Sequence, residues 1–123
     1  MLTVIEWWSL PDPEKVRLIE VVQARHSDEP WYQGFFHDIK CSPQVLDCFV
    51  RHVNQRRLLG KARISHKYAV EEMRAQGVTM RNKEPFNLNN NYTADIARLT
   101  MYLFPGDLGG LFRLRKRTIG EAA

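Results

Sequence analysis

Two cap-and-proline pairs constrain the fold of this chain more than any other feature of its sequence. Asp12-Pro13 and Ser42-Pro43 each place a helix-capping residue before a proline, which suits the first helical position because a helix leaves that N–H unbonded. Apolar residues then recur at helical spacing, as far as about Arg25 after the first pair and up to a glycine stop, Gly60, after the second. The sequence therefore predicts two amphipathic helices that share a core.

Two further helices are predicted in the second half of the chain, over residues 65–77 and 94–104. The first opens at a serine and closes at a glycine, and the second follows a threonine cap and is apolar around most of its circumference. We expect residues 1–8 to be extended, and residues 27–41, which contain proline and glycine, to form a loop anchored by aromatic side chains.

Two short segments alternate with the period of a strand. Phe86-Asn87-Leu88 follows a proline, and Phe112-Arg113-Leu114-Arg115 repeats the alternation near the end of the chain. Pairing of the two would place their apolar residues inward and the arginines outward. The expected fold class is therefore mainly α (α+β), a compact bundle of about four helices with a short two-stranded β-hairpin-like wing. At 123 residues, it forms a single domain over 1–123.

The charge of +4 is unevenly distributed. Residues 1–50 carry four basic and eight acidic side chains, whereas residues 51–123 carry fourteen basic and six acidic ones. Basic clusters attract phosphate or acidic protein surfaces, although each also serves as a solvated helix end. An exposed strip of the last helix adds an arginine and a tyrosine. The predicted contacts with a nucleic acid or an acidic partner are Arg51, Arg56, Arg57, Lys61, Arg63, Lys67, Arg98, Tyr102, Arg113, Arg115, Lys116 and Arg117.

Aromatic residues of the first third of the chain form the second set of candidate residues. Such residues usually fill a core, but tryptophan is also a frequent anchor of protein interfaces. The predicted protein-interface residues are Trp7, Trp8, Trp31 and Tyr32. Self-association into a homodimer that buries some of them is a further hypothesis.

The pattern His37-x₃-Cys41-x₆-Cys48-x₃-His52 is the one arrangement that bears on a metal. Structural zinc sites usually separate two cysteines by two to four residues, so we predict no metal here and two free thiols. His37-Asp38 is the only pair suggestive of acid–base chemistry, and no nucleophile or phosphate-loop motif accompanies it. We therefore expect no enzyme and no cofactor. The longest apolar run has four residues, so no membrane partner is expected and the predicted location is the cytoplasm.

Several short motifs are spread over about residues 35–117: Phe36-His37, Ser42-Pro43-Gln44-Val45, Ile64-Ser65, Phe86-Asn87-Leu88-Asn89-Asn90-Asn91-Tyr92, Ala97-Arg98-Leu99 with Met101, and Phe112-Arg113-Leu114-Arg115. Together they resemble small phage and prophage proteins. The resemblance implies a phage context and a host-cell location, but no mechanism. Residues 1–34 have no counterpart in the pattern and form a variable N-terminal segment, and the stretch from Gly77 to Pro85 lacks the basic-aromatic helix end of the pattern.

Two functions remain open at this stage. The first is a nucleic-acid-binding regulatory protein that contacts DNA phosphates through its basic surface. The alternative is a protein–protein effector, comparable to an anti-CRISPR protein, that inhibits a host defence complex or a nucleic-acid-processing complex.

Overall fold

The computed structural model describes residues 2–60, 66–75 and 90–109. Within these residues it contains no strand and has the helices α1 (Val4–Trp8), α2 (Asp12–Arg25), α3 (Phe35–Cys41), α4 (Pro43–Leu58), α5 (His66–Ala75) and α6 (Asn90–Leu103). The expected mainly α character is confirmed, with six described helices in place of about four. The two segments of the predicted wing, 86–88 and 112–115, lie outside the described residues.

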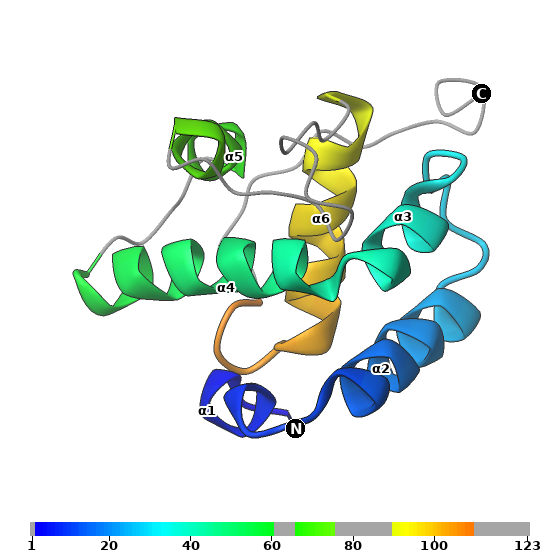
Figure 1. Cartoon of the computed structure of the whole chain (residues 1–123), viewed down its shortest axis with the longest axis horizontal. Coiled ribbons are helices and arrows are strands. Elements are labelled where there is room, and N and C mark those ends of the chain that lie inside the picture. The colour runs from blue at the N-terminus through cyan, green and yellow to red at the C-terminus, as the bar shows by residue number, and fades with distance from the viewer. Residues whose placement is uncertain (1, 61–65, 76–89, 110–123) are drawn as a thin grey trace.

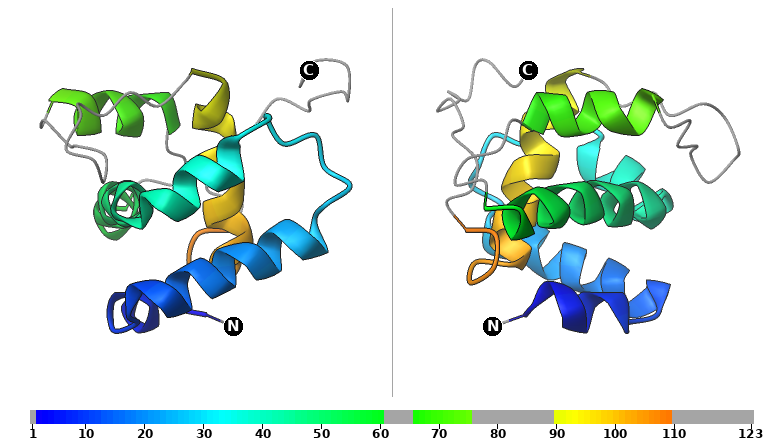
Figure 2. Two further views of the ribbon diagram at one scale, coloured as in Figure 1. Left: turned by 45° about the vertical axis from the view of Figure 1, so that its right-hand side comes forward. Right: turned by 90° about the vertical axis from the view of Figure 1, so that its left-hand side faces the viewer.

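Helix α6 lies at the centre of the arrangement (Figure 1). Helices α2 and α5 both pack against α6, α4 packs against α5 and α2, and α3 contacts α2 and α4. Helices α1 and α5 lie beside opposite ends of α6 in every view (Figure 2). The apolar faces of the helices consequently meet in one core, in which Ile19, Phe49, Leu99 and Phe104 are fully buried.

Helix α1 corrects the prediction of an extended segment over residues 1–8. Thr3 and Glu6 form a capping box: the backbone N–H of Glu6 donates to the Thr3 hydroxyl, and the backbone N–H of Thr3 donates to the Glu6 carboxylate. The backbone N–H of Val4, which no helical carbonyl can serve, donates to the carboxylate of Asp107 at 2.9 Å. A local motif and one distant side chain together stabilise this five-residue helix.

Helix α3 corrects the prediction of a loop over residues 27–41. Gly34 precedes the helix with a φ of 86°, a left-handed conformation that glycine adopts without strain. Phe35, Phe36 and Ile39 then turn into the core, where they are 1%, 6% and 2% exposed. The aromatic residues therefore lie mainly on a helix, and the loop is confined to residues 26–34.

The other helices agree with the expected positions: α4 begins at Pro43 after the N-cap Ser42, as predicted, and α2 and α6 differ at their first residues. Pro11 is the N-cap of α2, so Asp12 is the first helical residue, where its negative charge complements the helix dipole. Helix α6 begins at Asn90, four residues before the predicted start at residue 94. Thr93 is inside the helix and is 6% exposed, so it is not a cap.

Candidate interaction surface

Trp7 is a core residue, which contradicts its prediction as an interface residue. Its side chain is fully buried, and its ring packs edge-to-face on that of Phe104 with centroids 5.5 Å apart. The indole N–H donates a hydrogen bond of 2.8 Å to the Asp47 carboxylate. Trp7 is therefore buried while Trp8 is exposed, because adjacent helical residues point to different sides of the helix.

The carboxylate of Asp47 also receives a buried cation. Lys15 Nζ lies 3.0 Å from its second oxygen, with the two side chains 7% and 21% exposed. The same ammonium lies 5.4 Å from the centre of the Trp7 ring. One carboxylate on α4 therefore holds both α1 and α2. Because Trp7 is bonded to it, the opposite side of α1 points away from the core.

That other face of α1 continues onto α4 as an apolar surface with one arginine. Ile5 is 81% exposed and Trp8, one turn later, is 37% exposed. The guanidinium of Arg51 on α4 lies over the Trp8 ring at 5.7 Å. Leu58, seven residues after Arg51 and therefore on the same side of α4, is 70% exposed, and the following Leu59 is 78% exposed. We call Ile5, Trp8, Arg51, Leu58 and Leu59 the α1–α4 surface.

Arg51 is the predicted basic contact that best fits an external role. It is exposed, and no carboxylate lies within ion-pair distance of it among the residues that the structure describes. Arg56, by contrast, forms a 2.7 Å ion pair with Glu72 of α5, which also lies 3.3 Å from the ring of His52. Arg57 donates two hydrogen bonds to the side chain of Asn54, at 3.1 and 2.7 Å.

Seven other predicted contact residues cannot be located from the described side chains. Lys67 belongs to α5, but its side chain is not among those described. The remaining six lie outside the described residues: Lys61, Arg63, Arg113, Arg115, Lys116 and Arg117. The convergence of the basic clusters on one face therefore stays a prediction.

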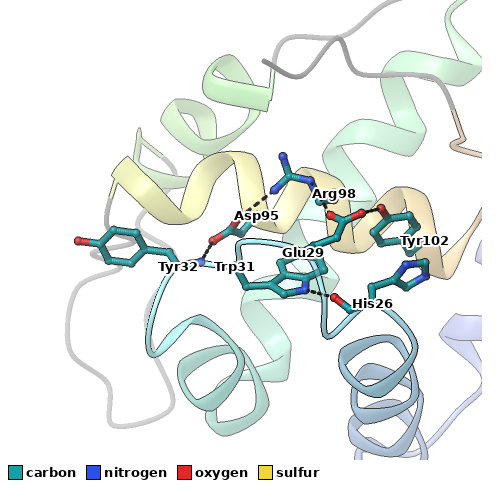
Figure 3. Close-up of polar contacts among 7 residues, drawn as sticks. All are labelled: His26, Glu29, Trp31, Tyr32, Asp95, Arg98 and Tyr102. Carbon is teal, nitrogen blue, oxygen red and sulfur yellow. Dashed lines mark hydrogen bonds and ion pairs between the residues drawn. The ribbon is translucent and has the colours of Figure 1, made fainter. Parts of the chain in front are cut away.

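Arg98 and Tyr102 are half-buried and bonded within the chain, which contradicts the prediction of an exposed strip on α6. The Arg98 side chain is 11% exposed and forms ion pairs with Glu29 at 3.3 Å and with the fully buried Asp95 at 3.1 Å (Figure 3). The Tyr102 hydroxyl donates to Glu29, and its ring stacks on that of His26 with centroids 3.7 Å apart. The loop of residues 26–34 covers this side of α6, so neither side chain is available to a phosphate.

This network also makes the Tyr102 hydroxyl a weaker acid than an ordinary tyrosine. Burial, the hydrogen bond to Glu29 and the negative charge of Glu29, in that order, raise the pKa of Tyr102 from 10.0 to about 12. The guanidinium of Arg98 acts in the opposite direction but does not outweigh them. The hydroxyl is thus a hydrogen-bond donor that locks the loop to α6.

Trp31 and Tyr32 belong to the same loop. The Trp31 indole N–H donates to the backbone carbonyl of His26 at 2.8 Å, and its ring packs edge-to-face on that of Phe36 with centroids 4.8 Å apart. The backbone N–H of Tyr32 donates to Asp95 at 2.9 Å. Both rings are half-buried, so their first role is to hold the loop, and a contact with a partner protein stays a prediction for them.

The four histidine and cysteine residues of the pattern from His37 to His52, for which no metal was predicted, do not form one cluster. His37 and Cys41 are one turn apart on α3, with Nε2 and Sγ 3.8 Å apart. Burial raises the pKa of the half-buried Cys48 thiol, and His52 faces Glu72 instead of a cysteine. In the described part of the chain, no group of three or more histidine, cysteine or acidic residues is placed to hold a metal ion.

Ile5, Leu58 and Leu59 were not among the interface residues predicted from the sequence. The signal for the two leucines was their position after the apolar stripe of α4 and directly before Gly60, where a helix end projects from the core. Ile5 had no such signal, because residues 1–8 were expected to be extended.

No helix among the described residues is long and apolar enough to span a membrane.

Comparison with protein-family models, with curated protein sequences and with solved structures gives no match to this chain.

Proposed function

We propose that this protein acts by binding another protein through the α1–α4 surface. The observation that carries the proposal is a set of exposed apolar residues on two neighbouring helices: Ile5 and Trp8 share one side of α1, and Arg51, which lies over the Trp8 ring, is on the side of α4 that carries Leu58. A single exposed leucine is common on proteins, whereas several large apolar side chains exposed on one side of two helices are typical of interaction sites.

The chemistry of the surface indicates the partner. Tryptophan and arginine are the residues that contribute most to binding when they are surrounded by apolar contacts. Stacking on Trp8 holds the Arg51 guanidinium in place, so less conformational entropy is lost when a carboxylate binds it. The surface is therefore suited to an apolar segment that carries an acidic residue. A host defence or nucleic-acid-processing complex, the target in the alternative hypothesis from the sequence, is one source of such a segment.

Nucleic-acid binding is the second candidate. Arg51 and the half-buried Arg57 lie in the C-terminal half of α4, in a chain whose residues 51–123 carry fourteen basic and six acidic side chains. A duplex would be bound with an affinity that falls steeply with salt. An apolar protein interface with one ion pair would lose little affinity between low and moderate salt, so the two candidates are separable in one titration.

The test uses photo-crosslinking amino acids placed singly at Ile5, Leu58 and, as the control, Val21. Val21 is an apolar residue of α2 with 37% exposure and lies outside the α1–α4 surface. A partner captured from positions 5 and 58 and not from 21 is then purified, and its dissociation constant is measured. We expect I5D and L58D to weaken binding by at least about tenfold and V21D to change it by less than about twofold.

Three outcomes would contradict the proposal: no product from positions 5 and 58, equal capture from position 21, or an affinity unchanged in I5D and L58D. A concentration-dependent dimer that I5D dissociates would identify a second copy of the chain as the partner and would overturn the choice of a different protein. Urea unfolding of each variant verifies that the helices remain folded.

A further inference from the structure

A pocket opens between the C-terminal half of α2, the loop of residues 26–34 and the start of α3, which are elements other than those of the α1–α4 surface. Its volume is about 430 Å³, which is within the range of roughly 300–1,000 Å³ typical of small-molecule sites. The lining includes three aromatic side chains, Trp31, Tyr32 and Phe36, together with Glu29 and His37. The pocket therefore combines aromatic walls with a carboxylate.

The charge around the pocket is opposite in sign to that of the whole chain. From Glu20 to Lys40 the sequence carries four carboxylates and two cations, a net charge of −2, whereas the chain as a whole is +4. Arg98 is shared between Glu29 and Asp95, so these three groups together carry a net charge of −1. A cation is consequently favoured in this pocket and an anion is disfavoured.

The aromatic lining restricts the kind of cation. Indole and phenol rings attract cations through their electron-rich faces, and the guanidinium of Arg98 already lies 5.7 Å from the centre of the Trp31 ring. A hard metal ion needs several oxygen ligands, and the described residues provide no such group at this position. An organic ammonium ion, with apolar methyl or methylene groups around its charge, matches both the rings and the net negative charge.

From these observations we propose that the pocket binds a small organic ammonium ion, of the quaternary ammonium or alkylamine class. The positive group lies among the aromatic rings near Glu29. The ion-paired position of Glu29, held by Arg98 and Tyr102, keeps its carboxylate in place before the ligand arrives. The wall formed by Gln23 and His37 supplies polar contacts for the rest of the molecule.

The experiment is a titration of the full chain with choline, followed by the NMR signals of the three tryptophan indole N–H groups. Trp31 lines the pocket, whereas Trp7 is buried in the core and Trp8 lies on the α1–α4 surface, so the latter two are internal controls. We expect saturable shifts of the Trp31 signal only. Its uncharged isostere, 3,3-dimethylbutan-1-ol, is expected to bind about fivefold more weakly because it lacks the charge.

A matched pair of variants at His37 tests the location without disturbing the core, because this side chain is exposed. H37K places a permanent positive charge in the lining and is expected to weaken choline binding about tenfold. H37Q introduces no charge and is expected to retain the affinity. No saturable shift of Trp31, equal affinity for the uncharged alcohol, or equal effects of H37K and H37Q would each overturn the proposal.

Discussion

The half-buried carboxylate of Asp47 offers the sharpest test of how α1 is held. It accepts the indole N–H of Trp7 at 2.8 Å and the ammonium of Lys15 at 3.0 Å, so it serves two helices at once. The variant D47N keeps an oxygen that accepts the indole N–H and removes only the negative charge. Lys15, 7% exposed, then remains in place with its counter-charge removed.

The magnitude follows from the burial of the two groups. Removal of one partner of a fully buried ion pair costs about 3–5 kcal/mol, because an uncompensated charge is left in a poorly solvated position. Asp47 is 21% exposed, and water screens the pair to that extent. We expect D47N to lower the free energy of unfolding by about 2 kcal/mol and the urea midpoint by about 1 M.

A double-mutant cycle separates the charge from the hydrogen bond. The same D47N change in a K15M background, where no buried cation remains, is expected to cost less than about 0.5 kcal/mol. D47A in that background also removes the acceptor of Trp7 and is expected to cost about 1–3 kcal/mol. Urea unfolding monitored by circular dichroism measures all variants. Equal costs of D47N in the two backgrounds would refute the assignment of Lys15 and Asp47 as a coupled pair.

Two further predictions concern the loop of residues 26–34. The folded-state pKa of Tyr102, about 12, exceeds its ordinary 10.0, so the stabilisation from the protonated hydroxyl is complete below pH 10.0 and is lost as the pH rises towards 12. Because the hydroxyl is partly exposed, we expect a loss of about 1 kcal/mol, measured by urea unfolding at a series of pH values. An equal decline in Y102F would contradict this reasoning. Gly34 and Gly60 form a matched pair, with φ of 86° and 85°, but a Cβ at Gly34 would lie 3.0 Å from the Tyr92 hydroxyl and one at Gly60 would meet nothing within 4 Å. We expect G60A to cost about 1 kcal/mol and G34A about 1 kcal/mol more, and thermal unfolding that ranks them equally would show that the Tyr92 contact is not restrictive.

The helices with local start signals were predictable from the sequence. A cap-and-proline pair acts over three or four residues, so α2 and α4 begin within one residue of their expected starts. Helix α1 also has a local start signal, the capping box of Thr3 and Glu6, which the prediction of an extended segment overlooked; only the bond from its first N–H to Asp107, 103 residues away, was not predictable from local sequence. Helix α3 was missed because the proline and glycine before it indicated a loop, while the burial of Phe35 and Phe36 favours a helix.

For the candidate sites, too, local sequence predicted the side of a helix on which a residue lies but not which distant segment covers it. Periodicity identified the side of α6 that carries Arg98 and Tyr102 as its least apolar side, but it contains no information on what covers that side. The covering loop brings Glu29 to both residues, and this pairing of groups more than 60 positions apart turns an expected contact surface into an internal network. The exposure of Leu58 likewise depends on where α4 extends beyond its neighbours.

The hydrogen bond between Val4 and Asp107, together with the packing of Trp7 on Phe104, has a consequence for biosynthesis. Two docking partners of α1, Phe104 and Asp107, are translated long after it, so until then only Asp47 and Lys15 can hold Trp7, and the face of Trp7 that packs on Phe104 stays uncovered. Helices α2, α3 and α4 can associate earlier, since their contacts lie closer together along the chain. A nascent chain stalled before residue 104 should therefore leave α1 open to proteolysis, and a chain extended beyond residue 107 should protect it.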